Sequence, residues 1–336
     1  MPRLADFTTL RLGGSASTWI EAATEAAFIS ALTAADEADE NVLVLGGGSN
    51  LVVADDGFDG TVIRVAMRGI DSDHIVDGTD VEVTVAAGEN WDDFVAHAVS
   101  SGWVGVEALA GIPGTVGATP MQNVGAYGQE VGQTIARVRV WDRRLKGART
   151  FTAAECGFGY RWSRFKADPG RHAILSVTFR FRTEGLAAPI AYAELARVLG
   201  VEVGEQAPLA DVRNAVLGLR RGKGMVLDAA DHDTWSAGSF FTNPFVDAAP
   251  EGAPAYPQPD GRVKTSAAWL IEHAGFTKGY GNEAVSLSSK HTLALTNRGE
   301  AKTEDLLALA REIRDGVTAT FGITLEPEPI FINCSL

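Results

Sequence analysis

The feature that most constrains this chain is a run of three glycines placed directly after a short apolar strand. The strand is predicted over residues 41–45, and Gly46, Gly47 and Gly48 follow it immediately. Glycine backbone adopts conformations closed to other residues, and its N–H groups can surround a phosphate. The loop is therefore either a structural turn or a pyrophosphate cradle. A Rossmann glycine pattern starting at Gly46 is excluded, because Leu51 stands where its last glycine belongs.

A second glycine-rich stretch favours the cradle. It covers residues 111–128 and follows an amphipathic helix predicted over residues 90–100. Two such loops in consecutive α/β units can hold the two ends of one dinucleotide. Structural turns rarely gather so many glycines, which here are Gly111, Gly114, Gly117, Gly125 and Gly128. We therefore expect both loops to bind one ligand.

The rest of the chain alternates helical and strand patterns, which predicts an α+β protein. At 336 residues it is long enough for two or three compact domains. The predicted helices cover residues 21–38, 193–199, 212–220, 267–274 and 302–321. The other predicted strands cover residues 51–53, 61–65, 81–87, 135–141, 173–182, 292–296 and 330–332, and a Pro- and Gly-rich surface loop is predicted over 248–262.

Charge and composition exclude several classes of partner. A formal net charge of -14 without any Lys/Arg block argues against nucleic acid. An anionic small molecule needs only a few placed cations, for which Arg161, Lys223 and Lys264 are candidates. The two cysteines form no disulfide framework or zinc pattern. Residues 1–9 lack a secretion signal and no apolar run is long enough to cross a bilayer, so we expect a cytoplasmic chain without membrane contact.

Four motifs in a fixed order make a resemblance to one family specific. They are Leu-Gly-Gly-Gly-Ser-Asn-Leu at 45–51, the second glycine stretch at 111–117 and 122–128, Tyr-Arg-Trp-Ser-Arg-Phe-Lys at 160–166, and Gly-Ser-Phe-Phe-Thr-Asn-Pro at 238–244. With them the chain resembles the UDP-N-acetylenolpyruvoylglucosamine reductases, flavoenzymes of peptidoglycan synthesis, in their longer type I subtype. The resemblance extends from about residue 6 to residue 332.

This resemblance implies a vanillyl-alcohol-oxidase-type FAD-binding fold of two domains plus a third, α/β substrate-binding domain. The first FAD-binding subdomain is expected at residues 1–66. The second is expected at 67–227, with the chain returning to it at 320–336, and the substrate-binding domain at 228–319. We also expect a monomer.

The resemblance further implies non-covalently bound FAD, with NADPH as co-substrate. Neither glycine loop contains a His or Cys to which flavin could be attached covalently. The residues expected to bind FAD are Gly46, Gly47, Gly48, Ser49, Asn50, Leu51, Gly111, Gly114, Thr115, Gly117, Asn123, Gly125 and Ala126.

Three residues match the catalytic positions of the family. Arg161 would bind the enolpyruvyl carboxylate and stabilise the charge that hydride addition sends there, although without the family context a solvated guanidinium is the commoner explanation for such an arginine. Ser239 would protonate the carbon next to the carboxylate, with a turn or helix-cap serine as the alternative. Glu328 is preferred to Glu326 as the supporting carboxylate. Pro329 and the residue after it depart from the commoner Val-Arg of the family.

The expected substrate-binding residues match positions that hold uridine, phosphates or the sugar. They are Tyr160, Tyr192, Lys223, Asn243, Tyr256, Lys264 and His291, of which His291 is equally well explained as a surface residue. Asp231, His232 and Asp233 look like a metal cluster, but no further ligands support one and we expect no metal.

The sequence therefore predicts an FAD-dependent oxidoreductase that uses NADPH to reduce UDP-N-acetylenolpyruvoylglucosamine to UDP-N-acetylmuramate. An FAD oxidase of the same fold is the first alternative, and the missing covalent attachment residue counts against it. A nucleotide-sugar-binding regulator without catalysis is the second. Such a regulator would be expected to lack Arg161, Ser239 or Glu328, and all three are present.

Overall fold

The chain forms two compact units, each assembled from segments that are distant in the sequence. The structure is a computed structural model that describes residues 1–76, 80–183 and 185–336. Unit 1 consists of Met1–Ala16, Gly48–Phe58 and Gly222–Leu336, and unit 2 of Ser17–Gly47 and Asp59–Arg221. The three functional domains expected at 1–66, 67–227 and 228–319 remain a prediction.

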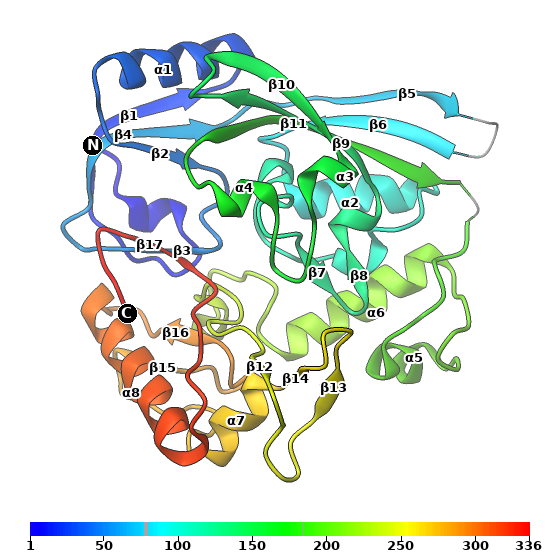
Figure 1. The fold of residues 1–336 in the computed structure, drawn as a ribbon, viewed down its shortest axis with the longest axis vertical. Helices are drawn as coiled ribbons and strands as arrows, with labels where there is room; N and C mark the ends of the chain where they lie inside the picture. The colour runs from blue at the N-terminus through cyan, green and yellow to red at the C-terminus, as the bar shows by residue number, and fades with distance from the viewer. Residues whose placement is uncertain (77–79, 184) are drawn as a thin grey trace. The chain divides into compact units, whose positions relative to one another are not determined.

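Unit 2 is built on a five-stranded antiparallel sheet with one helix on its apolar face (Figure 1). Ring contacts carry this packing: the centroids of Phe94 in the helix and Phe179 in the sheet lie 5.1 Å apart. Asn90 caps the helix by accepting the N–H of Asp93. The strands, in spatial order, are β10 (Gly147–Thr152), β9 (Ile135–Asp142), β11 (His172–Arg182), β6 (Asp80–Ala86) and β5 (Ile70–Val76), and the helix is α2 (Trp91–Ser100).

A smaller sheet in unit 2 leads into the first glycine loop. Strand β2 pairs in parallel with β4, and β2 ends at the residue before Gly46. The sheet contains β1 (Ala16–Ala22), β4 (Phe58–Val65) and β2 (Val42–Leu45), and α1 (Glu25–Glu37) packs against β2. The remaining elements of this part of the chain are β7 (Gly125–Ala126), β8 (Gln129–Glu130), α3 (Ala153–Cys156), α4 (Arg164–Ala167), α5 (Ala193–Leu199) and α6 (Leu209–Gly222).

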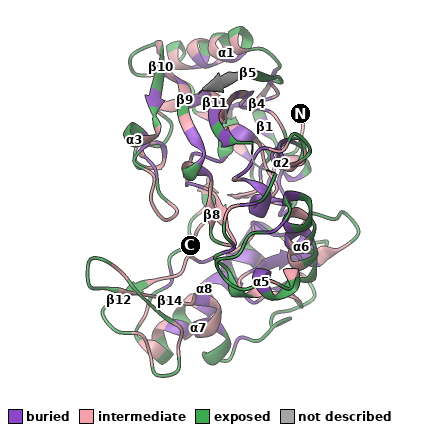
Figure 2. Cartoon of the chain, turned by 90° about the vertical axis from the view of Figure 1, so that its right-hand side faces the viewer, coloured by how far each residue is buried: buried purple, intermediate pink, exposed green. Residues whose placement is uncertain are grey.

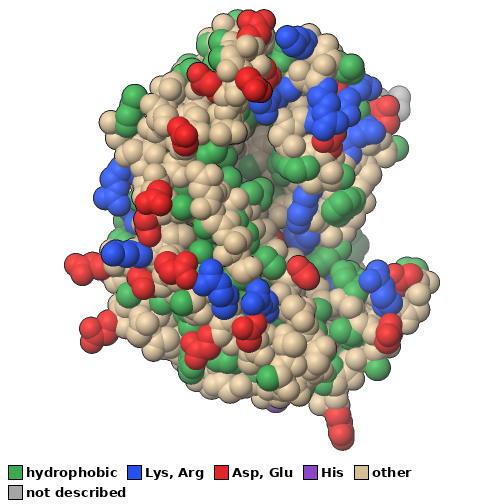
Figure 3. Space-filling model, turned by 60° about the vertical axis from the view of Figure 1, so that its left-hand side comes forward, with side chains coloured by type: hydrophobic (Ala, Val, Ile, Leu, Met, Phe, Trp, Pro, Cys, Tyr) green, Lys and Arg blue, Asp and Glu red, His purple; other side chains and the backbone are tan. Residues whose placement is uncertain are grey.

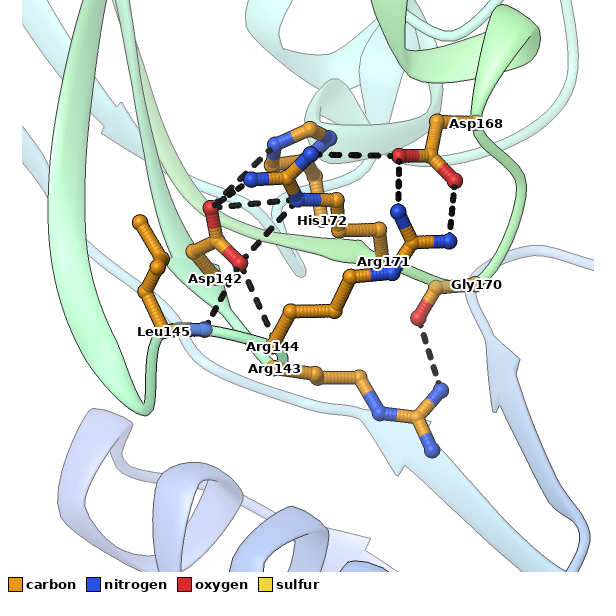
Figure 4. Close-up of polar contacts among 8 residues, drawn as sticks. All are labelled: Asp142, Arg143, Arg144, Leu145, Asp168, Gly170, Arg171 and His172. Carbon is orange, nitrogen blue, oxygen red and sulfur yellow. Dashed lines mark hydrogen bonds and ion pairs between the residues drawn. The ribbon is translucent and has the colours of Figure 1, made fainter.

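A buried carboxylate fixes the outer end of the large sheet (Figure 4). Asp142, at the end of β9, is fully buried and accepts hydrogen bonds from Arg171 Nη2 at 2.9 Å and from the Leu145 N–H at 3.1 Å. Arg171 also contacts Asp168. The hydrogen bonds from Arg171, helped by the Leu145 N–H, lower the pKa of Asp142 to about 2. This carboxylate therefore joins the β9–β10 turn to the start of β11.

Unit 1 is a mixed α/β unit with its own apolar core. The core includes Phe240, Phe241, Leu270 and Ile313, which are fully or almost fully buried. Its helices are α7 (Ala267–His273) and α8 (Thr303–Phe321). Its strands form the parallel pair β3 (Leu51–Val53) and β17 (Ile330–Ile332), the antiparallel pair β15 (Val285–Leu287) and β16 (Leu295–Asn297), and the sheet β12 (Phe245–Val246), β14 (Val263–Thr265) and β13 (Ala255–Pro257). Exposed and half-exposed residues dominate β12 and β14 in Figure 2.

Most predicted elements are present, and the differences are local. The helix predicted over 21–38 begins at Glu25, because Glu21 and Ala22 end strand β1. The segment expected to be a surface loop, residues 248–262, contains the strand β13. It pairs with β14 at the edge of its sheet, where a proline such as Pro257 is tolerated because no further strand needs its N–H. The strand predicted over 292–296 begins later, at Leu295.

Charges of both signs are interspersed on the face shown in Figure 3, where Lys and Arg side chains lie among Asp and Glu. This matches the sequence, which carries 29 basic and 43 acidic residues without a basic block. Among the described residues, no helix is both long and apolar enough to span a bilayer.

Candidate active site

The two glycine loops touch in unit 2. A Cβ atom added to Gly47 would lie 2.6 Å from the Cα of Gly114, and one added to Gly46 would lie 2.7 Å from Thr115 Oγ1. Real side chains do not tolerate such distances, so glycine is required for this contact. Thus the structure brings together residues that the sequence placed in separate parts of one expected ligand site.

The second loop is held by residues that sequence reasoning missed. The carboxylate of Asp92, on α2, accepts a hydrogen bond from the Gly111 N–H at 2.7 Å. It also forms an ion pair with Arg213 of α6, whose Nη2 lies 3.2 Å from Asp92 Oδ2. Further along, the Gly117 N–H donates to Ala87 O, and a Cβ on Gly117 would lie 2.5 Å from the Ala87 Cβ. An acidic residue in the first turn of a predicted helix gave no signal that it would position a loop.

The end of the first glycine loop belongs to unit 1 and meets the C-terminal segment there. Gly48 has φ +60°, and Asn50 Nδ2 donates to Glu328 O at 3.3 Å. The Ile330 N–H donates to Asn50 O, and Leu51 is opposite Ile330 in the β3–β17 pair. Glu328 therefore lies beside residues expected to contact the cofactor.

These loops fit a dinucleotide such as FAD. The first loop ends a strand of a parallel pair, and its glycines leave the backbone without side chains that would obstruct a phosphate. Thr115, whose Oγ1 lies nearest to Gly46, adds a hydroxyl that can donate to a phosphate oxygen. The residues present thus suit the group that the sequence predicted.

Arg161 sits in unit 2 in a left-handed backbone conformation, with φ +50°. Its Nη2 donates to Gly125 O in β7 at 3.1 Å, and its guanidinium carbon lies 5.4 Å from the ring centre of Tyr160. Lys166 Nζ donates to the Arg161 carbonyl at 3.1 Å. The predicted Tyr-Arg pair therefore lies directly against the predicted cofactor loop.

Asn123 is buried and its side chain is committed to the loop itself. Its Nδ2 donates to Glu130 Oε2 at 2.8 Å and to Gly159 O at 3.1 Å, while its Oδ1 accepts the Gly132 N–H at 2.9 Å. Its φ is +48°. We conclude that the side chain joins the loop to the Tyr160 segment, so a cofactor contact would be left to the Asn123 backbone.

Two tyrosines of this region are in contact. The rings of Tyr127 and Tyr192 meet edge to face with centroids 5.4 Å apart.

Arg220 is a further cation near Tyr127, and the sequence did not predict it as a site residue. Burial lowers the pKa of Arg220, in the last turn of α6, to about 10, although the charges of Tyr127 and Asp92 raise it. The guanidinium stays charged at neutral pH. In the sequence Arg220 belongs to an ordinary-looking basic group at a helix end.

Ser239 and Glu328 lie on neighbouring backbone segments of unit 1. The Phe240 N–H donates to Leu293 O at 2.7 Å, and the Glu328 N–H donates to Phe240 O at 2.8 Å. Ser239 and Glu328 are half-buried, whereas Glu326 is exposed. Ser239 is not followed by a helix, which argues against its being a helix cap.

Asp231 and Asp233 are committed to contacts within unit 1. Asp233 accepts the Ser289 N–H at 3.0 Å and Arg298 Nη1 at 2.8 Å, and Asp231 pairs with Lys290. Although burial raises the pKa of Asp233, the hydrogen bonds from Ser289 and Arg298 lower it below its ordinary range. Within the described parts of the chain, no group of three or more His, Cys, Asp or Glu could hold a metal ion. His291 follows the loop residues that these contacts hold.

Three other expected substrate residues of unit 1, Tyr256, Lys264 and Asn243, lie on or just before strands of the β12–β14–β13 sheet. Tyr256 and Lys264 are directly opposite each other in the β13–β14 pair, so their side chains share a face. Asn243 Oδ1 accepts the Ala267 N–H at 2.9 Å, at the start of α7. Lys223, just after α6, is half-buried.

Comparison with known proteins gives first the class and then the family. A family model described as FAD binding domain matches residues 16–144, and one described as UDP-N-acetylenolpyruvoylglucosamine reductase, C-terminal domain, matches residues 230–332. The α+β fold and these matches define an FAD-dependent oxidoreductase, as predicted.

Close relatives extend over nearly the whole chain. UDP-N-acetylenolpyruvoylglucosamine reductases of Cutibacterium acnes and Thermobifida fusca are 56% and 57% identical, over 99% of this chain and 90% and 97% of their own lengths. The crystal structure of UDP-N-acetylenolpyruvylglucosamine reductase from Thermus caldophilus is 25% identical, with a TM-score of 0.65 and coverage of 98% of this chain and 97% of that chain. The chain belongs to the UDP-N-acetylenolpyruvoylglucosamine reductase family.

Proposed function

We propose that this chain reduces UDP-N-acetylenolpyruvoylglucosamine to UDP-N-acetylmuramate with NADPH, through bound FAD, in the synthesis of peptidoglycan precursors. The observation that carries the proposal is the position of Arg161. Its guanidinium donates to Gly125 O, within the loop that packs against Gly46 and Gly47 through Gly114. A cation suited to a carboxylate therefore stands beside the backbone suited to the cofactor.

The cofactor and the protein divide the chemistry. FAD, held by residues 46–51 and 111–126, supplies the hydride chemistry between NADPH and the substrate. Arg161 binds the enolpyruvyl carboxylate with its planar donors and stabilises the negative charge that develops there. Tyr160, stacked beside it, limits the orientations of the guanidinium.

Ser239 donates the proton that completes the reduced side chain. A serine hydroxyl is a weak acid in water, so this role needs a polar neighbour that replaces the lost proton. Glu328 is the candidate, because its backbone is hydrogen-bonded to Phe240, the residue after Ser239. Glu326 is exposed and less suited to this role.

The nucleotide part of the substrate requires cations and aromatic rings. Lys223 and Lys264 hold the phosphates as point charges, and Tyr256 lies opposite Lys264 to contact the uridine. The other proposed substrate contacts are Tyr192, Asn243 and His291. We further propose that the enzyme is a cytoplasmic monomer and that its product supports cell shape and cell division.

The test follows the flavin absorbance of the purified protein under anaerobic conditions. NADPH should remove the oxidised-flavin band, and UDP-N-acetylenolpyruvoylglucosamine should restore it with formation of a product heavier by two hydrogens. A protein whose band is lost with NADPH but is not restored by the enolpyruvyl sugar would contradict the proposed substrate. Acid precipitation should release all the flavin, since attachment is non-covalent.

A further inference from the structure

We propose that Lys166 is a positioning residue for Arg161, and that its ammonium group keeps Arg161 in the backbone conformation that directs its guanidinium toward the cofactor loop. This inference rests on the proposed function, in which Arg161 binds the substrate carboxylate. Lys166 itself is not assigned to contact substrate or cofactor.

Arg161 needs such support because its backbone is strained. With φ +50° it occupies the left-handed region, which is unfavourable for a residue with a Cβ atom. Asn123 and Tyr127 also have positive φ and lie in the neighbouring glycine-rich loop. Strain of this kind persists only where surrounding contacts hold it.

The turn that contains Arg161 is closed by reciprocal backbone bonds. The Gly159 N–H donates to Trp162 O and the Trp162 N–H donates to Gly159 O, both at 3.1 Å. Asn123 Nδ2 donates to Gly159 O as well. These contacts hold the turn and the N–H side of the peptide between Arg161 and Trp162, whereas the carbonyl oxygen of that peptide accepts from a side chain.

Lys166 supplies that contact. It lies in the short helix α4, and its Nζ donates to the Arg161 carbonyl at 3.1 Å. The helix is anchored in turn, because the buried Ser163 caps it and donates its Oγ to Met121 O at 2.6 Å. The ammonium is thus tied through α4 to the glycine-rich loop, and it fixes the Arg161 peptide relative to that loop.

The charge of Lys166 acts in the same direction as its hydrogen bond. The Lys166 ammonium and the Arg161 guanidinium are both positive and repel each other. Conformations in which the guanidinium turns back toward α4 are therefore unfavourable. The guanidinium instead lies at Gly125 O. The second positive charge also raises the local potential that attracts a carboxylate.

The experiment compares Lys166→Met with Lys166→Arg, because methionine keeps most of the stem without a donor and arginine restores a charged donor. We measure flavin reduction by NADPH, flavin reoxidation by the enolpyruvyl substrate, substrate affinity by calorimetry, and melting temperature. Lys278→Met, at an exposed position of unit 1, is the control for loss of a lysine charge.

For Lys166→Met we expect reoxidation to slow by roughly tenfold and substrate affinity to fall, since a hydrogen bond from a charged group is lost. Reduction by NADPH should stay within about twofold of wild type, because Arg161 acts on the substrate carboxylate. Lys166→Arg should recover most of the loss. Lys166→Gln, which keeps a donor without the charge, replaces the methionine variant if that variant does not fold.

Unchanged reoxidation in Lys166→Met would overturn the inference, and so would equal slowing of both half-reactions without rescue by arginine. Arg161→Gln is measured in parallel to separate this inference from the proposed function. If Arg161→Gln leaves reoxidation unchanged, the role of Arg161 itself is wrong. If Arg161→Gln slows it and Lys166→Met does not, Lys166 alone is wrongly assigned. In the double variant we expect the two effects to be clearly less than additive.

Discussion

The two units hold their proposed catalytic groups by different means. In unit 2, Arg161 has a left-handed backbone that side chains stabilise, among them Lys166 and Asn123. In unit 1, the Ser239 and Glu328 segments are joined by backbone hydrogen bonds, such as that from the Glu328 N–H to Phe240 O. A single substitution can remove a side chain that holds Arg161, whereas a substitution other than to proline leaves these main-chain hydrogen bonds in place.

This difference predicts different effects of substitutions in the two units. In unit 2 we expect variants outside the chemical step to disturb the geometry of the site. In unit 1 we expect the reacting side chains to be removable one at a time with little change in fold. The four predictions below test this contrast in descending order of expected free-energy change.

The largest effect is expected for Asn123→Ala, which should lower the free energy of unfolding by roughly 3 kcal/mol. The variant removes three hydrogen bonds from a buried side chain and leaves the Gly132 N–H without its acceptor. It also places alanine at φ +48°. Urea unfolding followed by fluorescence measures the change.

Asn214→Ala, at an exposed position of α6, is the matched control and should change stability by about 0.5 kcal/mol or less. If Asn123→Ala is no less stable than this control, the side chain does not hold the loop. The contrast between the two units would then lose its main support.

The second prediction is that Ser239→Ala separates the two half-reactions. Reoxidation of the flavin by the enolpyruvyl substrate should slow by at least ~10²-fold, the lower end for removal of a positioned general acid. Reduction by NADPH should keep close to its normal rate in rapid mixing, since it takes no proton from this serine. The melting temperature should stay near that of wild type, because the backbone bonds around Phe240 remain.

Equal slowing of both half-reactions would mean that Ser239 supports the fold or a step common to both. The proton donor would then be sought elsewhere. Glu328→Gln, with Glu326→Gln as its exposed control, is the next comparison.

The third prediction uses a part of unit 2 outside the proposed site. Asp142→Asn should cost about 2 kcal/mol of stability at neutral pH, the scale of hydrogen bonds to a charged group. Because the pKa of Asp142 is lowered to about 2, its stabilisation is present above about pH 4 and is lost as the pH falls toward 2. The stability difference between wild type and variant should therefore shrink over that range.

Asp260→Asn is the control, because Asp260 pairs with Arg262 in an ion pair that is half exposed. We expect it to change stability little, because an ion pair at an exposed position contributes little to stability. The measured quantity is the difference in free energy of unfolding between wild type and Asp142→Asn. If this difference does not change between pH 4 and pH 2, the Asp142 carboxylate is not the titrating group.

The sequence predicts the loops better than the contacts that hold them. Gly46, Gly47 and Gly114 were placed in ligand loops because a run of glycines has a direct physical meaning, and the structure brings those loops together. The left-handed backbone conformation of Arg161 could not be predicted from the sequence, because arginine has no preference for that conformation. It follows from contacts with Lys166 and Gly125 that exist only after folding.

Distant contacts were out of reach for the same reason. Asn50 and Glu328 are 278 positions apart, and their contact depends on the parallel pairing of β3 with β17. Asp142 and Arg171 meet because β9 and β11 are neighbours in the sheet. Strand order is not encoded in local periodicity, so neither pair was predicted, although the strands themselves were.

The smallest effect is expected for Lys264→Ala in unit 1, which should raise KM about tenfold and leave kcat nearly unchanged. The lysine is proposed to hold a phosphate of the substrate, which lies far from the bond that reacts. Such an interaction is equally strong in the ground state and the transition state, so its loss weakens binding without slowing the chemical step. Lys223→Ala should behave alike, and Lys278→Ala, at an exposed position, is the control. A fall in kcat with constant KM would place Lys264 in the chemical step, and unit 1 would then contribute a cation to catalysis as unit 2 does with Arg161.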